Sequence, residues 1–137
     1  MLNLFLVASA AQTLAPLPPP PATCDPFFIF FEEGSARVSP EQQRMLDHIA
    51  LAAPMFKPPV KITGYAADPG SDADNLNLSM RRASAVRDAL IERGMARDRL
   101  ALRALGKLNP LPKTKDGSSE QMSRRVTVDD CPSRNGS

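Results

Sequence analysis

The segment GYAADPGSDADNLNLSMRRA, from Gly64 to Ala83, holds the residue types whose spacing best suits ligand binding. A glycine-ended strand pattern leads into a turn, and Arg81 and Arg82 follow on a predicted helix. A guanidinium can grip a carboxylate through two parallel hydrogen bonds, and backbone N–H groups at a helix start favour anions. The segment therefore predicts either a pocket for an anionic ligand or a strand–turn–helix corner whose arginines face water.

Groups suited to catalysis or to metal binding are scarce. His48, the only histidine, lies in a predicted helix. It has no nucleophile near it and no other ligand at a metal-binding spacing, so we interpret it as a histidine that faces solvent or makes its hydrogen bonds within the protein. Asp72 and Asp74 lack the glycine and glutamate pattern of a calcium loop. No phosphate-loop or zinc signature is present. The sequence favours a non-enzymatic binding module with no metal and no cofactor.

The charge pattern argues against nucleic-acid binding. The formal net charge is only +2, and Tyr65 is the single tyrosine in a chain without tryptophan, so few side chains could stack on bases. Basic residues do gather after residue 80, but acidic ones lie among them: Arg81, Arg82, Arg87, Arg93 and Arg97 are interspersed with Asp88, Glu92 and Asp98. Helical geometry spreads these charges around the helix axis, so the basic residues do not share one face.

The chain divides into a leader, a spacer, one domain and a tail. Residues 1–15, MLNLFLVASAAQTLA, have the length of a signal-peptide apolar region and are too short to span a membrane. A start codon misplaced relative to the true one is the alternative, because no Lys or Arg precedes the apolar run. Residues 16–24 form a proline-rich linker, residues 25–130 a single domain, and residues 131–137 a disordered tail. We expect no transmembrane span in the mature chain.

The first strand and the first helix have clear signals in the sequence. The continuous apolar run FFIFF, Phe27–Phe31, predicts an interior strand at the centre of the core, covered on both faces. Residues 39–53, SPEQQRMLDHIALAA, predict a helix with Ser39 as N-cap, Pro40 at the first helical position and Gln42 completing a capping box.

The remaining elements follow from alternation and capping signals. Ser71 and Asp74 can cap a second helix, and Gly94 ends it as a C′ glycine. Alternating apolar residues predict strands at 60–65, 99–105 and 124–128, with a polar loop at 106–123. The order is β-α-β-α-β-β, and right-handed crossovers put both helices on one face of a mixed sheet of about four strands. This is an α+β two-layer sandwich, with Phe28 and Phe30, or Phe27 and Phe31, buried beneath the helices.

The two cysteines flank the predicted domain, Cys24 before the first strand and Cys131 after the last. An exported chain can oxidise such a pair, and in the chain-entropy model the closed loop would stabilise by up to ~4.7 kcal/mol. A bridge requires the first and last strands to be antiparallel neighbours. Two unpaired thiols in a reducing compartment are the alternative.

Several motifs in order resemble the OmpA-like peptidoglycan-binding domain. The matches at the family's spacing are Gly64, Gly70, Asn75, Leu78, Ser79, Arg82, Ala83 and Val86. Further matches are the opening at Phe31–Ala36, Gly106 to Pro110, and Arg124 to Val126. The resemblance covers roughly Pro26 to Val128 and implies the OmpA-like fold, which has the element order derived above.

The resemblance also implies a ligand site. Family members hold the diaminopimelate side chain of the peptidoglycan stem peptide between an aspartate, which takes the ammonium, and an arginine, which takes the carboxylate. Arg82 corresponds to that arginine, whereas Ala67 stands at the aspartate position. Asp68 is adjacent, but neighbours in an extended segment point to opposite sides, so we expect it to face away unless the turn is shifted. Asn75 and Arg125 are the further candidate ligand contacts.

The implied function is non-covalent association with the peptidoglycan stem peptide, in the periplasm at the cell wall or outer membrane. Loss of one charged hydrogen bond costs about 1.5–3 kcal/mol, roughly one to two decades of affinity, so Ala67 predicts a weakened site. The alternative is a degenerate member of the family that binds an envelope protein, with Arg82 an ordinary solvated arginine.

Overall fold

The computed structural model describes residues 25–107 and 118–131. These form β1 (Phe27–Phe30), α1 (Pro40–Ala52), η1 (Ala53–Met55), β2 (Val60–Gly64), α2 (Asp72–Glu92), η2 (Arg97–Arg99), β3 (Leu100–Ala104), α3 (Ser118–Ser123) and β4 (Arg125–Asp129). The predicted signal peptide, the linker with Cys24, and residues 132–137 of the predicted tail lie outside the described residues.

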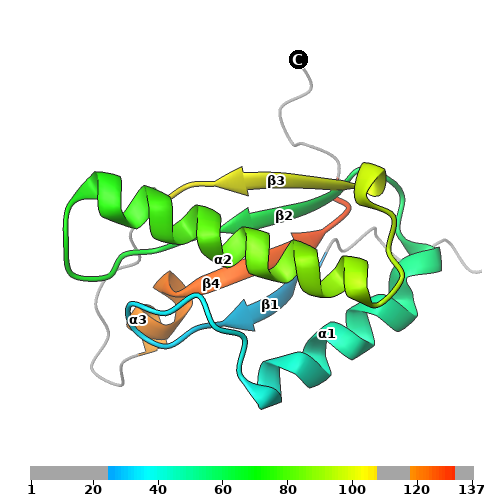
Figure 1. Ribbon diagram of the computed structural model, residues 1–137, viewed down its shortest axis with the longest axis horizontal. Helices are drawn as coiled ribbons and strands as arrows, with labels where there is room; N and C mark the ends of the chain where they lie inside the picture. The colour runs from blue at the N-terminus through cyan, green and yellow to red at the C-terminus, as the bar shows by residue number, and fades with distance from the viewer. Residues whose placement is uncertain (1–24, 108–117, 132–137) are drawn as a thin grey trace, which may run out of the picture.

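The strands form one mixed sheet in the order β1-β4-β2-β3. β2 and β3 are parallel, while β4 is antiparallel to both of its neighbours, β1 and β2. Both long helices cover the same face: α2 runs across β2, β3 and β4, and α1 lies beside it next to β1 (Figure 1). The predicted α+β fold, with two helices on one face of a mixed sheet, is confirmed.

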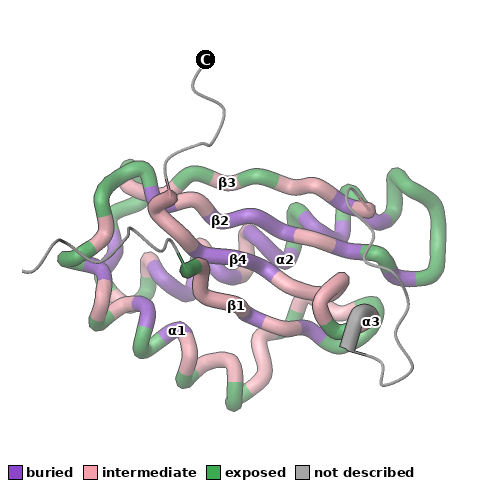
Figure 2. Tube along the Cα trace, turned by 180° about the vertical axis from the view of Figure 1, so that it is seen from behind, coloured by how far each residue is buried: buried purple, intermediate pink, exposed green. Residues whose placement is uncertain are grey.

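The core lies between the sheet and these two helices. Alternating residues of β2 and β4 point inward and are fully buried, and the inner stripe of each helix meets them. Figure 2 shows this burial concentrated on the central strands, with the edge strand β3 mostly half-buried or exposed. The fully buried apolar residues of the sheet and helices are Ile29, Leu46, Ile49, Val60, Ile62, Ala83, Val86, Leu90, Val126 and Val128.

The prediction for the phenylalanine run was partly wrong. β1 is an edge strand, paired on one side only, and it does not lie at the centre of the core. Phe31 is buried on the helix face and Phe27 packs against that core, whereas Phe28 and Phe30 lie half-buried on the other face. Their rings stack with centroids 6.1 Å apart, so the two side chains cover each other. This mutual cover, rather than a second layer, explains the apolar run.

The helix caps follow the sequence with one exception. Ser39 accepts a hydrogen bond from the Gln42 N–H at 3.3 Å, as predicted, but the reciprocal half of the capping box does not form. Gln42 Oε1 instead accepts from the Phe30 N–H at 3.0 Å, which satisfies a donor on the open edge of β1. Ser71 and Asp74 form the predicted capping box of α2. Gly94 follows α2 with φ of +98°, as expected of a C′ glycine.

A short helix was missed. α3 lies in the segment predicted as a polar loop, of which residues 108–117 are outside the described residues. Glu120, Gln121 and Met122 are good helix formers, but a six-residue element is too short to show a helical apolar period. Among the described helices, none combines the length and the apolar character that crossing a membrane requires.

Candidate functional site

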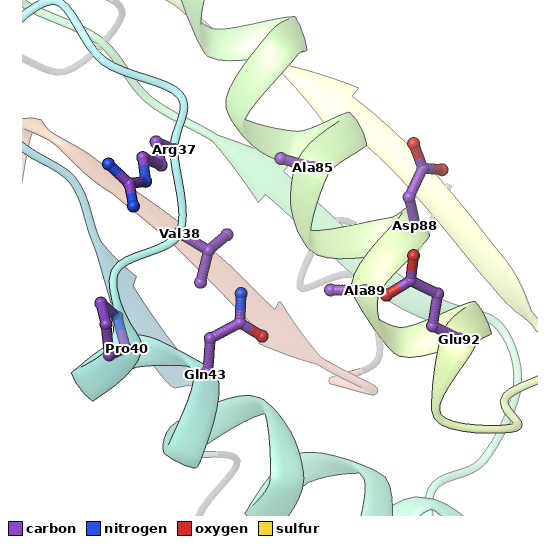
Figure 3. Close-up of a pocket in the computed structure, with 8 residues that line it drawn as sticks. All are labelled: Arg37, Val38, Pro40, Gln43, Ala85, Asp88, Ala89 and Glu92. Carbon is purple, nitrogen blue, oxygen red and sulfur yellow. The ribbon is translucent and has the colours of Figure 1, made fainter.

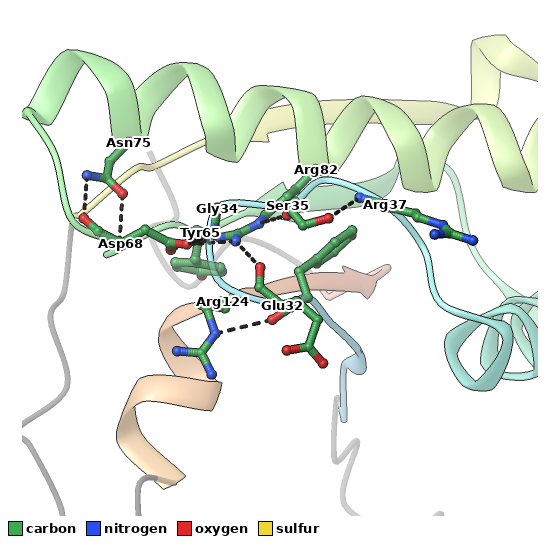
Figure 4. A network of polar contacts seen from close by, with 10 residues as sticks. Glu32, Gly34, Ser35, Arg37, Tyr65, Asp68, Asn75, Arg82 and Arg124 are labelled. Carbon is green, nitrogen blue, oxygen red and sulfur yellow. Dashed lines mark hydrogen bonds and ion pairs between the residues drawn. The ribbon is translucent and has the colours of Figure 1, made fainter.

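Arg82 lies at the centre of the polar network that joins α2 to the loops after β1 and β2 (Figure 4). Its side chain is 0% exposed, and all five of its N–H donors are used within the chain. Nε donates to the Ser35 carbonyl at 2.8 Å, Nη1 to the Tyr65 carbonyl at 3.2 Å and Nη2 to the Glu32 carbonyl at 3.0 Å. The two remaining donors reach the Asp68 carboxylate.

Asp68 forms a bidentate ion pair with Arg82. Nη1 is 3.2 Å from Oδ1 and Nη2 is 3.1 Å from Oδ2, the fork geometry that suits a guanidinium and a carboxylate. The Asp68 side chain is only 4% exposed, and Oδ2 also accepts from the Gly34 N–H. The centre of the Phe31 ring lies 5.4 Å from the guanidinium carbon of Arg82. The pair is therefore a buried and well-satisfied charge pair.

Asn75 fixes the main chain that carries this carboxylate. Its Oδ1 accepts from the Asp68 N–H at 2.8 Å, and its Nδ2 donates to the carbonyls of Asp68 and Ser71 at 2.9 and 3.0 Å. Asn75 is 1% exposed, so its amide has no free face for a ligand. Its role in this structure is to hold the loop between β2 and α2 against the first turn of the helix.

Two arginines at the start of the last strand make further contacts beside the network. The Arg125 guanidinium carbon lies 3.9 Å from the centre of the Tyr65 ring, a cation–π contact, and Arg125 Nη1 donates to the Met122 carbonyl. Arg124 Nε donates to the Phe31 carbonyl at 3.2 Å. Arg124 therefore joins the loop after β1 to the start of β4, and Arg125 joins the loop after β2 to the same point.

One expectation about the site was wrong, and one alternative is excluded. Asp68 does not face away from Arg82, with which it forms an ion pair. The backbone stays paired beyond Gly64 through the N–H groups of Tyr65 and Ala66, and the alternation turns Asp68, not Ala67, toward Arg82. Ala67, not Asp68, is the exposed residue. Nor is Arg82 a solvated helix arginine, since it is completely buried.

Sequence reasoning also missed the loop between β1 and α1 as part of the site. The carbonyls of Glu32 and Ser35 and the N–H of Gly34 converge on the Arg82–Asp68 pair from more than thirty residues away in the chain. The available signal was the match of Phe31–Ala36 to the family's opening motif. The contacts are made by the main chain, so residue types could not reveal them.

Comparison with known proteins assigns the family. A model of the OmpA family matches residues 30–125. The chain belongs to the OmpA family. It is 32% identical over 134 residues to outer membrane protein A of Shigella flexneri, which covers 93% of this chain and 38% of that protein. The OmpA-family chain thus spans well under half the length of that relative.

Solved structures agree with this assignment. The peptidoglycan-associated lipoprotein from Burkholderia pseudomallei is 28% identical, with a TM-score of 0.65 over 74% of this chain and 87% of that one. The C-terminal domain of Helicobacter pylori MotB, 22% identical, shares the fold with a TM-score of 0.66 over 81% of this chain and 87% of that one. OmpA-like domains are non-enzymatic modules that generally bind peptidoglycan. Within residues 25–107 and 118–131, no group of three His, Cys, Asp or Glu residues is placed to hold a metal ion.

Proposed function

We propose that this protein is a non-enzymatic cell-envelope module that associates non-covalently with the diaminopimelate side chain of the peptidoglycan stem peptide. The observation that carries the proposal is the bidentate grip of Arg82 on a carboxylate at 3.1–3.2 Å in a buried corner. That corner has the chemistry to hold a carboxylate, because it already holds one. We place the mature protein in the periplasm, at the cell wall or outer membrane.

The contact for the ammonium group of a zwitterionic ligand is the weaker half of the proposed site. Ala67 is exposed on the loop and offers no charge for an ammonium group. A charged hydrogen bond is worth about 1.5–3 kcal/mol, so its absence lowers affinity by roughly one to two decades. The proposed association is accordingly weaker than that of a site with both charges.

Ala67→Asp is expected to strengthen retention on peptidoglycan. The added carboxylate supplies a partner for the ammonium group at the edge of the same corner, and we expect up to roughly tenfold to hundredfold tighter binding. The measurement is co-sedimentation with purified insoluble peptidoglycan, with and without free diaminopimelate as competitor.

Ala73→Asp provides the matched control, since Ala73 is also exposed and lies in the first turn of α2. An unspecific effect of one more negative charge would appear in both variants. Equal retention of both variants and the unsubstituted protein would count against a stem-peptide site.

A second candidate function, binding of an envelope protein, is favoured by a separate groove. A cavity of about 660 Å³ lies between α2 and the segment that leads into α1 (Figure 3). Val38, Ala85 and Ala89 supply its apolar surface. Asp88, which pairs with Arg87 at 3.0 Å, and Glu92 lie along α2, and Arg37 lies on the opposite side. Such a surface suits a partner segment that presents an apolar side chain flanked by charges of both signs.

The same sedimentation assay separates the two functions. Retention that diaminopimelate reverses supports the stem-peptide function. Absence of retention both for the unsubstituted protein and for Ala67→Asp favours the protein partner, because the residues that line the groove do not include Ala67, Asp68 or Arg82.

A disulfide between Cys24 and Cys131 also stays a prediction, since Cys24 lies outside the described residues. It is supported by the antiparallel pairing of β1 with β4, in which Phe27 lies opposite Val128. If the same register extended three residues further, it would pair position 24 with Cys131. We expect the intact mass of the non-reduced protein to be about 2 Da below that of the reduced protein, and alkylation without reductant to label neither cysteine. Labelling of both would exclude the bridge.

A further inference from the structure

We infer that Asp68 is an internal competitor for the carboxylate of the ligand, so that its withdrawal from Arg82 limits the affinity of this domain for peptidoglycan. The inference rests on the proposed function, because it concerns the same corner.

The first step is the saturation of Arg82. Its five N–H donors meet three main-chain carbonyls and both oxygens of Asp68, and its side chain has no exposed surface. A guanidinium has no further donors to offer. A carboxylate arriving from outside can therefore bind Arg82 only if Asp68 leaves. The three carbonyls belong to the frame of the fold, which makes Asp68 the replaceable partner.

The second step is the way Asp68 is held. Its main chain is clamped on both sides by the Asn75 amide, at 2.8 Å and 2.9 Å. Its side chain has two tethers, Arg82 and the Gly34 N–H. Withdrawal breaks these two side-chain tethers, while the contacts of Asn75 with the main chain can stay in place. The flanking residues Ala67 and Pro69 are exposed, so the displaced carboxylate would reach water within one residue of its buried position.

The third step compares how strongly the ligand carboxylate and the Asp68 carboxylate bind Arg82. The incoming and the outgoing carboxylate make the same two charged hydrogen bonds to Arg82, so this contact contributes little net affinity. The internal carboxylate is also tethered, which gives it a high effective concentration. The apparent affinity equals the affinity of the open corner multiplied by the fraction of molecules in which Asp68 is withdrawn. A corner in which one molecule in about a hundred is open would bind about a hundredfold more weakly than an open one.

Chemical rescue by acetate tests whether the corner takes up a carboxylate from outside once Asp68 is absent. Asp68→Ala leaves a space the size of a carboxylate beside a buried guanidinium, and acetate should fill it. We expect acetate at tens of millimolar to raise the melting temperature of Asp68→Ala, relative to chloride at equal ionic strength, because a ligand that binds only the folded state stabilises it. The unsubstituted protein and Asp98→Ala, which removes an exposed carboxylate, should respond to acetate no more than to chloride. Equal acetate responses in Asp68→Ala and Asp98→Ala would overturn the inference.

Asp68→Asn is the second variant, used for the binding test because it preserves the shape of the side chain and one acceptor. An amide competes for Arg82 more weakly than a carboxylate. We expect about tenfold tighter retention on purified peptidoglycan, reversed by free diaminopimelate, with Asp98→Asn unchanged. Retention that Asp68→Asn leaves unchanged would overturn the competitor while the proposed function stands. Acetate rescue without retention of any variant would support the competitor and count against peptidoglycan as the ligand.

Discussion

Replacement of Arg82 by alanine is expected to lower the free energy of unfolding by about 3–5 kcal/mol, because the loss of one partner leaves the other charge of a buried pair uncompensated. The Asp68 carboxylate would keep only its hydrogen bond from the Gly34 N–H. The carbonyls of Ser35 and Tyr65 would also lose their hydrogen bond from Arg82, while that of Glu32 would keep the one from the Ser35 N–H at 3.1 Å. Urea denaturation measures the change as a lower midpoint at an unchanged slope. Loss of ligand binding in Arg82→Ala would therefore not by itself identify Arg82 as a ligand contact.

Arg87→Ala is the matched control on the same helix. Arg87 pairs with Asp88 at 3.0 Å, but the Asp88 side chain is 57% exposed. Exposed pairs contribute about 0–1 kcal/mol. Arg82→Lys should fall between the two, since a lysine retains the charge but cannot supply five donors in a plane. A cost for Arg82→Ala within about 1 kcal/mol of that for Arg87→Ala would contradict the buried-pair interpretation.

The fold was largely accessible from the sequence because most elements carry local signals. Alternation identified β2, β3 and β4, and the Ser71–Asp74 capping box identified the start of α2. The position of β1 was not accessible in this way. A run such as Phe27–Phe31 looks the same whether a second layer covers its outer face or two of its own rings cover each other. The pattern of apolar residues shows which positions are buried, but it does not show which part of the protein covers them.

The site was accessible only in part. The spacing of Gly64, Asn75 and Arg82 predicted a corner at the start of α2, and the corner is present. Ala66 and Asp68 are buried and Ala67 is exposed, so the alternation continues past Gly64 and turns Asp68 toward Arg82. The residue types of the loop do not show which of Ala67 and Asp68 faces Arg82. The path of the loop is held by contacts distant in the chain, such as the hydrogen bond from the Tyr65 N–H to the Arg125 carbonyl at 2.9 Å.

Gly64 is the residue that sets the approach of α2 to this loop, and Gly64→Ala is expected to destabilise the fold by about 3 kcal/mol or more. A Cβ at position 64 would lie 2.0 Å from the Ser79 carbonyl oxygen and 3.2 Å from the Ala83 Cβ. The first of these atoms belongs to the helix backbone and cannot rotate away. The helix would have to lift from the sheet, which would also separate Arg82 from Asp68. Thermal or urea unfolding of the variant measures the cost.

Two comparisons separate this clash from the general cost of replacing a glycine. Gly94→Ala adds a Cβ with nothing within 4 Å, at a φ of +98°, so only backbone strain of about 1 kcal/mol is expected. Ala83→Gly combined with Gly64→Ala should not restore stability, because it removes the 3.2 Å contact and leaves the 2.0 Å contact with the backbone of Ser79. Recovery in the double variant would show that the side chain of Ala83, and not the helix backbone, limits the approach. The distance between α2 and the loop would then be set by side-chain packing, and the geometry that brings Asp68 to Arg82 would tolerate an alanine at position 64.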